Sequence, residues 1–339
     1  MSSRLKAVRT DAELECPHLD AGLRARGLDL VLLPDGVAEA ELARHTRDAD
    51  ILLMCYTPVT AQVIAGAQRL RGIVKYGVGI DAIDIESAKA RRIPVVNVPE
   101  YAERTVAEGA FALLLALARK LAPMHEAMRR EGWLWPGAPW LASDIAGKTL
   151  GLVGVGRIGR SMARMAAGFQ MRVLGVDPHV SAGEMRAAGV EKRDSLPAML
   201  AECDFVSIHC VLNDATRGLV GRREFERMKP GAILINVSRG ALVDEAALLR
   251  ALQDGRLGGA GLDVYAQEPL ALGGHPLSAL FGMDNVILMP HLTFFTREAM
   301  QRLEEETLQR CDELLAGEPV LVKSRDPRLT SQRHGVRFG

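Results

Sequence analysis

Short apolar runs alternate with amphipathic segments through the first 98 residues of the chain. Runs of this length are typical of buried strands, and the segments between them are typical of helices. An alternation of this kind predicts a parallel sheet that is covered by helices on both faces. The predicted strands are Leu5–Val8, Asp29–Leu33, Ile51–Tyr56, Leu70–Tyr76 and Val95–Val98.

The same alternation resumes at Thr149 and predicts a second α/β domain with a sheet of its own. The basic segment from Val320 onward, which glycine and proline punctuate, is expected to be a loose tail. The pattern as a whole predicts an α/β chain with two doubly wound parallel sheets. The predicted strands of the second sheet are Thr149–Val153, Arg172–Val176, Phe205–Ile208, Ala232–Asn236, Gly259–Asp263 and Val286–Leu288, and the predicted helices are Ile158–Phe169, Glu245–Gln253 and Thr296–Leu315.

Two further features lie between these halves. Thr105–Arg119 is apolar on most faces, which predicts a buried helix that connects the domains and is a candidate for contact with another subunit. All three tryptophans, Trp133, Trp135 and Trp140, follow in a segment expected to be a loop. Such a cluster fits a packed arm and an interface anchor equally well.

A glycine motif joins the first strand of the second sheet to its first helix. Gly154, Gly156 and Gly159 form the pattern G-x-G-x-x-G between them. In this pattern the first glycine permits a tight turn, the second lets a pyrophosphate lie against bare backbone, and the third allows close packing of helix and strand. The next predicted strand ends in Asp177, an acid suited to the ribose hydroxyls of a dinucleotide. Strand, turn, helix and acid together predict a dinucleotide site.

The composition of the chain excludes several classes of protein. The chain has 339 residues, enough for two domains, and 42 basic residues balance 42 acidic ones. No global field would therefore attract nucleic acid or an anionic membrane. The five cysteines have neither C-x-x-C nor zinc spacing, so they are interpreted as reduced thiols and no metal site is expected. Because the first residues lack the apolar core of a signal peptide and the longest apolar run is half a membrane span, we expect a soluble cytoplasmic protein.

Polar residues follow three predicted strands of the second half, and the carboxyl ends of parallel strands meet at one edge of a sheet. His291 is suited to exchange a proton near neutral pH, and a carboxylate such as Glu268 would orient its ring and favour its charged form. Arg239 could grip a carboxylate and polarise a keto oxygen. Taken singly, each residue is more simply interpreted as a rim or loop residue, and His209, which follows a strand close to the glycine motif, is a weak rival for His291.

In the first half, Val78 and Gly79 follow the predicted strand that ends at Tyr76. Their amides could hold a carboxylate, because ligands bind at this end of open parallel sheets. From this piece alone, a plain turn is slightly the better interpretation.

Six segments form a joint signature that covers nearly the whole chain. They are YGVGIDAID at 76–84, VAEGAFALLLALAR at 106–119, GKTLGLVGVGRIG at 147–159, NVSRGALVDEAALLRAL at 236–252, GAGLDVYAQEP at 259–269 and PHLTFFT at 290–296. With these segments the chain resembles the NAD-dependent dehydrogenases that are specific for D isomers of 2-hydroxy acids. The resemblance implies interconversion of a D-2-hydroxy acid and its 2-keto acid by hydride transfer, favouring keto-acid reduction.

The resemblance also implies an architecture and a set of site residues. A Rossmann cofactor domain at 102–292 would be inserted into a flavodoxin-like substrate domain made of 1–101 and 293–339, and homodimers would form through the cofactor domains. The implied catalytic residues are Arg239, Glu268 and His291, and the implied substrate contacts are Tyr76, Val78, Gly79, Arg239, His291 and Phe294. The implied NAD contacts are Gly154, Gly156, Arg157, Ile158, Gly159, Asp177, Pro178, Cys210, Val211, Thr216, Val237, Ser238, Arg239, Asp263 and His291.

The chain also departs from the family pattern. Ala82, Ala102 and Val211 stand where the family often has Asn, Asn and Pro, which bears on loop rigidity and substrate fit. Phe294 and Phe295 resemble the aromatic pair of the C-terminal binding proteins, which are co-repressors on this fold. An NAD(H)-sensing interaction protein with weak dehydrogenase activity is therefore the alternative.

Two expectations concern selectivity. Asp177 is followed by Pro178, and no arginine is near to accept a 2′-phosphate, so NAD is favoured over NADP. An apolar wall at Phe294 and Phe295 favours a short or apolar 2-keto acid, because an unpaired buried anion is costly. Lys75 opposes this expectation, since it could pair with a distal carboxylate or phosphate, although its direction within the predicted strand is unknown.

Overall fold

The structure, a computed structural model, describes residues 5–339, so the first four residues of the amino-terminal segment considered above lie outside it. The chain divides into two compact units. The first joins the segment that ends at Ala102 to Thr296–Gly339, and the second is the continuous segment Glu103–Phe295. The second unit is thus inserted into the first.

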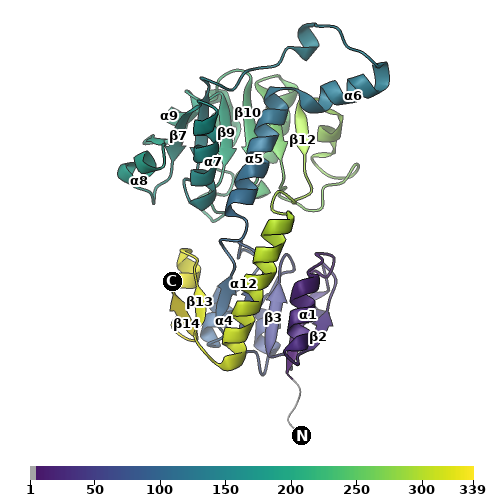
Figure 1. Ribbon diagram of the computed structural model, residues 1–339, viewed down its shortest axis with the longest axis vertical. Helices are drawn as coiled ribbons and strands as arrows, with labels where there is room; N and C mark the ends of the chain where they lie inside the picture. The colour runs from purple at the N-terminus through teal and green to yellow at the C-terminus, as the bar shows by residue number, and fades with distance from the viewer. Residues whose placement is uncertain (1–4) are drawn as a thin grey trace. The chain divides into compact units, whose positions relative to one another are not determined.

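The first unit is built on a five-stranded parallel sheet, part of which is labelled in Figure 1. The strand order is β2-β1-β3-β4-β5. This is the doubly wound flavodoxin-like order, in which ligands bind at the carboxyl ends of the strands. The strands are β1 (Lys6–Arg9), β2 (Asp29–Leu32), β3 (Ile51–Met54), β4 (Gly72–Lys75) and β5 (Val95–Asn97), and the helices are α1 (Pro17–Ala25), α2 (Glu39–Thr46), α3 (Ala61–Gly66), α4 (Ile85–Ala90) and α12 (Arg297–Ala316).

The last segment of the chain folds onto this unit. β13 (Val320–Val322) and β14 (Val336–Phe338) form a parallel pair, and α13 (Pro327–Thr330) lies between them in sequence. Val320, Val322 and Leu329 are buried, and the side-chain amide of Gln332 binds both the N–H and the C=O of Val95 on the edge strand β5. The prediction of a loose tail is therefore wrong, because apolar residues scattered among charged ones find a core and a sheet edge to cover.

The second unit is built on a seven-stranded parallel sheet with the order β12-β11-β10-β9-β6-β7-β8. The order reverses between β6 and β9, which is the switch point where Rossmann sheets bind dinucleotides. The strands are β6 (Thr149–Val153), β7 (Arg172–Val176), β8 (Glu191–Lys192), β9 (Phe205–Ile208), β10 (Ala232–Asn236), β11 (Leu257–Leu262) and β12 (Val286–Leu288). The helices are α5 (Glu103–Ala118), α6 (Leu121–Glu131), α7 (Arg157–Gly168), α8 (Ala182–Ala187), α9 (Leu196–Leu200), α10 (Arg222–Arg227) and α11 (Glu245–Gln253).

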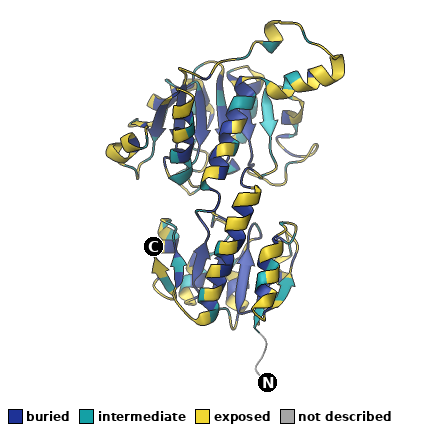
Figure 2. Cartoon of the chain, viewed as in Figure 1, coloured by how far each residue is buried: buried dark blue, intermediate teal, exposed yellow. Residues whose placement is uncertain are grey.

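Helix α5 occupies the apolar segment noted in the sequence and lies in the second unit. It packs against α7, β10 and β11. Gly261 makes this packing possible, since a Cβ there would lie 2.9 Å from Ile235 and 3.0 Å from Leu113. Figure 2 shows α5 largely buried where it covers the sheet and α6 largely exposed. Among the described residues, no helix combines the length and apolarity needed to cross a bilayer.

Candidate active site

The glycine turn lies at the switch point of the second sheet. Gly154 has φ of +94°, and a Cβ there would lie 2.6 Å from the backbone nitrogen of Cys210 on the neighbouring strand-end loop. A Cβ at Gly159 would collide with the carbonyl oxygen of Gly154, whereas a Cβ at Gly156 would meet nothing within 4 Å. The first and third glycines thus serve close packing, and the second leaves open space against bare backbone.

Helix α7 begins directly after this open space, with Gly156 as its N-cap residue. Arg157, Ile158 and Gly159 form its first turn, whose amides make a favourable anion environment. Asp177 follows β7, and its carboxylate accepts hydrogen bonds from the N–H of Val155 and the N–H of His179, both at 2.9 Å. A bare turn, a helix amino terminus and an oriented acid fit the pyrophosphate and ribose of a nicotinamide dinucleotide.

Two loops continue this surface at the ends of β9 and β10. The hydroxyl of Ser238 donates to the carbonyl oxygen of Cys210 at 2.6 Å, which joins the loops. Thr216 donates to the carbonyl oxygen of Val211 at 2.7 Å and closes the loop after β9. Burial raises the pKa of the Cys210 thiol to about 11, so this thiol stays protonated near neutral pH. Val237, beside Ser238, is buried.

The loop that carries Arg239 is held by its neighbours. The side chain of Asn236 donates to the carbonyl oxygen of Arg239 at 2.9 Å and accepts from the N–H of Ser238 at 3.1 Å. Gly240 lies so close to the backbone of Tyr265 that any side chain there would collide with it. Arg239 therefore projects from a loop fixed against the segment that leads to Glu268.

Glu268 and His291 are paired. His291 Nδ1 lies 2.9 Å from one carboxylate oxygen of Glu268, and the other oxygen accepts from the N–H of Tyr265 at 2.9 Å. Burial opposes ionisation of Glu268, but the bond from His291, the charge of that ring, the Tyr265 amide and Arg239 together lower its pKa below the ordinary value. Both side chains stay partly exposed, at 35% for Glu268 and 26% for His291. The pair is an oriented imidazole that solutes can reach.

The backbone around His291 is held in an uncommon conformation. His291 has φ of +60°, in the left-handed region that non-glycine residues rarely adopt and that concentrates at functional sites. The buried carboxylate of Asp263 fixes the following residues, accepting from the N–H of Leu292 at 2.8 Å, from the N–H of Thr293 at 3.1 Å and from the Thr293 hydroxyl. Burial raises the pKa of Asp263 despite these bonds. Asp263 is thus an anchor of the His291 loop.

His209 proves a poor rival for His291. Its Nε2 lies 2.9 Å from the Ser207 hydroxyl, and its Nδ1 is buried without a partner among the described residues. Burial lowers the pKa of His209 to about 4. A buried ring that stays neutral near neutral pH is less suited than His291 to give a proton to a substrate.

The predicted substrate contacts of the first unit lie after β4. Val78 is exposed and Gly79 is half-buried. The Tyr76 side chain is fully buried, and its hydroxyl donates to the carbonyl oxygen of Thr10 at 2.5 Å. Lys75 is also buried, with its ammonium group bound to the carbonyl oxygen of Cys55.

Phe294 and Phe295 follow His291 in the second unit. The Phe294 ring is buried and the Phe295 ring is 48% exposed, and the two meet edge to face at 6.0 Å. The anchoring roles of Asn236, Gly240 and Asp263 could not be predicted from the sequence beyond their place in the matching segments, because their contacts depend on loops that meet only in the fold.

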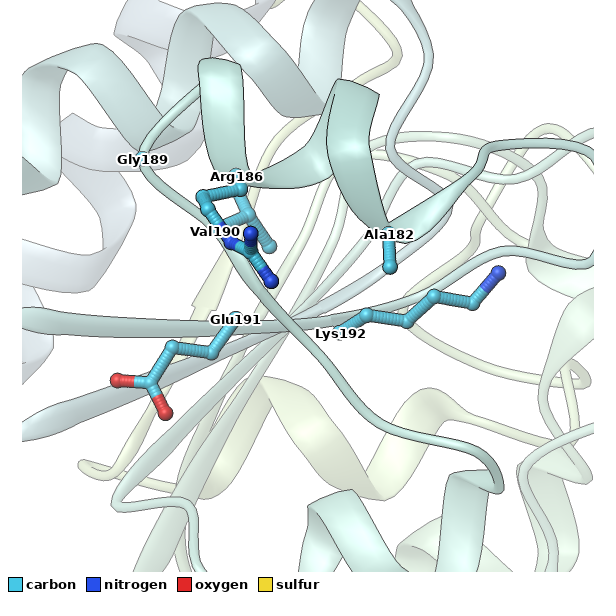
Figure 3. A pocket seen from close by; sticks show the side chains of 6 residues that line it. All are labelled: Ala182, Arg186, Gly189, Val190, Glu191 and Lys192. Carbon is cyan, nitrogen blue, oxygen red and sulfur yellow. The ribbon is translucent and has the colours of Figure 1, made fainter.

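A surface hollow of about 340 Å³ lies apart from these residues, between α8 and β8 (Figure 3). It is lined by Ala182, Arg186, Gly189, Val190, Glu191 and Lys192. No residue of the predicted site belongs to it. Among the described residues, no group of His, Cys, Asp and Glu side chains is arranged to hold a metal ion.

Comparison with known proteins identifies the family. Residues 111–293 match the NAD binding domain of D-isomer specific 2-hydroxyacid dehydrogenases. A glyoxylate reductase of Korarchaeum cryptofilum is 40% identical over 267 residues, which cover 78% of this chain and 79% of the reductase. The chain belongs to the D-isomer specific 2-hydroxyacid dehydrogenase family. It is accordingly an oxidoreductase that acts on 2-hydroxy or 2-keto acids with a nicotinamide cofactor.

Further relatives of the dehydrogenase differ in length. A D-3-phosphoglycerate dehydrogenase of Mycobacterium leprae is 37% identical over 285 residues, which cover 84% of this chain and 52% of that protein. The chain thus spans about half the length of such relatives.

Solved structures match both sheets of the dehydrogenase. The D-lactate dehydrogenase of Aquifex aeolicus, complexed with NAD and lactic acid, has a TM-score of 0.83 at 28% identity and covers 92% of this chain and 96% of that one. An acyclic imino acid reductase in complex with NADPH and D-Arg has a TM-score of 0.83 at 30% identity and covers 93% of this chain and 99% of that one. The predicted fold, two doubly wound parallel sheets, is confirmed.

Proposed function

We propose that the dehydrogenase reduces a short 2-keto acid to the D-2-hydroxy acid with NADH, and that Arg239, Glu268 and His291 are its catalytic residues. The observation that carries this proposal is the hydrogen bond between His291 Nδ1 and Glu268. Glu268 follows β11, and Arg239 lies in the loop after the neighbouring strand β10. Because Glu268 occupies Nδ1, it leaves Nε2 as the ring nitrogen that meets substrate.

The three residues have different roles. The guanidinium of Arg239 grips the substrate carboxylate and polarises the keto oxygen, which draws electrons from the carbon to be reduced. His291 gives its Nε2 proton to that oxygen, and Glu268 stabilises the charged ring before the transfer. When bound, the nicotinamide supplies the hydride. The balance is one keto acid, one NADH and one proton consumed for one hydroxy acid and one NAD⁺.

The cofactor is proposed to be NAD(H). The acid after β7 would repel a 2′-phosphate, and its orientation by the amides of Val155 and His179 supports this assignment. We expect kcat/KM for NADH to exceed that for NADPH by at least about 10-fold, and Asp177→Ala to narrow the gap. Equal use of both cofactors by the wild type would contradict the assignment.

The substrate is proposed to be short and to carry one carboxylate. Lys75 is turned towards Cys55, which supports setting aside its pairing with a distal phosphate. The glyoxylate reductase relative agrees in size, whereas the phosphoglycerate dehydrogenases point to a phosphorylated substrate. Steady-state NADH oxidation with glyoxylate, pyruvate, 2-ketoisocaproate, phenylpyruvate and 3-phosphohydroxypyruvate tests the choice. The highest kcat/KM for the phosphorylated acid would reverse it.

A homodimer through the second unit is also proposed. Trp133, Trp135 and Leu141 follow α6 and are 65%, 79% and 77% exposed, an apolar arm too large to leave in water. Of the two interpretations of the tryptophan cluster, these exposures favour the interface anchor. Analytical ultracentrifugation should give a dimer that the double variant Trp133→Ala/Trp135→Ala weakens. A monomeric wild type would exclude the proposal.

A further inference from the structure

A buried lysine lies beneath the Gly77–Gly79 turn of the first unit. Lys75 ends β4 and is 5% exposed. Its ammonium group donates to the carbonyl oxygen of Cys55, lies 3.3 Å from the Cys55 sulfur, and stands 5.4 Å from the centre of the Tyr56 ring. The whole side chain is therefore folded under the loops that follow β3 and β4.

This cation lacks an acidic partner. Among residues 5–339, no carboxylate forms an ion pair with Lys75. Asp11, the carboxylate that serves the same loops, accepts instead from the N–H groups of Cys55, Tyr56 and Thr57. A buried charge without a counter-ion is costly, so an anion placed nearby is favoured.

The turn above the lysine has its carbonyls tied and its amides available. Gly77 accepts from the N–H of Val98 at 3.1 Å, and Val78 accepts from the side-chain amide of Asn97 at 2.6 Å. The N–H groups of Val78 and Gly79 have no acceptor among the described residues. These two backbone donors thus belong to a turn whose carbonyl groups are held by Asn97 of β5 and by Val98, the residue that follows it.

The lysine touches this turn from below. A Cβ built on Gly77 would lie 2.9 Å from Lys75 Nζ and 3.0 Å from its Cε, so the absence of a side chain lets the ammonium rest against the turn's backbone. Any residue other than glycine there would also be strained by the φ of +152°. The charge is therefore held against the turn that carries the Val78 and Gly79 amides.

We propose that Lys75 is a positioning residue for the substrate carboxylate. It supplies a fixed positive charge next to the turn that carries the Val78 and Gly79 amides. Asn97 sets the direction of the Gly79 amide through the Val78 carbonyl, and Val98 sets that of the Val78 amide through the Gly77 carbonyl. The inference rests on the proposed function for the identity of the anion. It differs from the earlier expectation for Lys75, since the lysine acts through the turn on the carboxylate shared by all 2-keto acids.

The test compares Lys75→Met, which keeps the stem and removes the charge, with Lys75→Arg, which keeps the charge. Lys75→Met should raise KM for pyruvate or glyoxylate about 10-fold or more, while kcat stays within about 3-fold and NADH affinity is unchanged. Lys75→Arg should recover most of the loss. Methyl pyruvate, which lacks the carboxylate, should be reduced equally well by the wild type and Lys75→Met.

A purely structural lysine would behave differently. Equal losses for pyruvate and methyl pyruvate, or an unchanged KM in a folded Lys75→Met protein, would overturn the proposal. If Lys75→Met does not fold, Asn97→Asp is tested in its place. A negative charge at the same turn should also raise KM about 10-fold or more. An unchanged KM in Asn97→Asp would overturn the proposal as well.

A binding measurement without turnover tests the role of Lys75 independently of the proposed reaction. Calorimetry with oxamate, in the presence of NADH, should give a Kd that rises about 10-fold or more in Lys75→Met. A wild type that binds oxamate in this way but reduces no keto acid would refute the proposed function and leave the inference standing. A wild type that reduces keto acids while Lys75→Met binds oxamate normally would refute the inference alone.

Discussion

His209 makes stability depend on pH in a window that can be calculated. Its ring stays neutral in the folded protein because burial lowers its pKa from 6.5 to about 4. In the unfolded chain the ring takes up a proton below pH 6.5. Between these values the unfolded state binds more protons, so the free energy of unfolding must fall as the pH is lowered.

The size of the effect follows from the shift. A difference of about 2.5 pKa units at 1.36 kcal/mol per unit gives at most about 3 kcal/mol. The contribution is complete above pH 6.5, declines as pH falls through the window, and is lost near pH 4. For comparison, whole domains are stable by about 5–15 kcal/mol, so the loss should be a measurable fraction of the stability of the second unit.

The assay compares urea unfolding of the wild type and His209→Gln from pH 7.5 to 4.5, followed by circular dichroism. Glutamine keeps a polar atom for Ser207 but does not titrate. Subtracting the free energies of unfolding of the two proteins cancels the contributions of Asp and Glu. The advantage of the wild type in this free energy should shrink or reverse by about 2 kcal/mol as the pH falls. His125→Gln, on the exposed side of α6, should run parallel to the wild type. Parallel curves for His209→Gln as well would refute the reasoning.

Three further predictions concern catalysis and the cofactor turn. His291→Ala should lower kcat by roughly 10² to 10⁴ and leave the NADH dissociation constant nearly unchanged, as stopped-flow fluorescence can measure, because most of the implied dinucleotide contacts lie on other residues, at the glycine turn and Asp177. Glu268→Gln should move the alkaline limb of the kcat/KM profile for keto-acid reduction to lower pH, since the carboxylate that supports the charged ring is gone, and an unmoved limb would uncouple the pair. Gly154→Ala should cost about 1–3 kcal/mol of stability and weaken NADH binding, because its Cβ would meet the Cys210 backbone at a positive φ, and an unchanged Tm would contradict the close approach.

The predictable part of the fold is the part written in short-range patterns. Buried strands such as β6 and β10 are continuous apolar runs, so their place and order along the chain could be predicted. The glycine turn was predictable for the same reason, since its three glycines are needed at a fixed spacing. Helix α6 was not predicted, and only Ala127 of its residues is buried.

Contacts between residues far apart in the chain could not be predicted from the sequence. The direction of Lys75 depends on Cys55 at the end of another strand, and the fixed tail depends on Gln332 meeting Val95. The chemistry of Glu268 and His291 could be proposed from residue type, but their bond exists only because two loops meet at one edge of the sheet.

The contact between Gln332 and Val95 has a consequence for solubility. Edge strands expose unpaired backbone groups that recruit strands from other molecules, and here a side-chain amide occupies both groups of Val95 on β5. The final segment thus covers part of the exposed edge of the parallel sheet and hinders pairing with a strand of another molecule. A chain cut before Val320 would keep all of its catalytic residues and still present a bare edge to its neighbours, so we expect it to fail by self-association rather than by loss of chemistry.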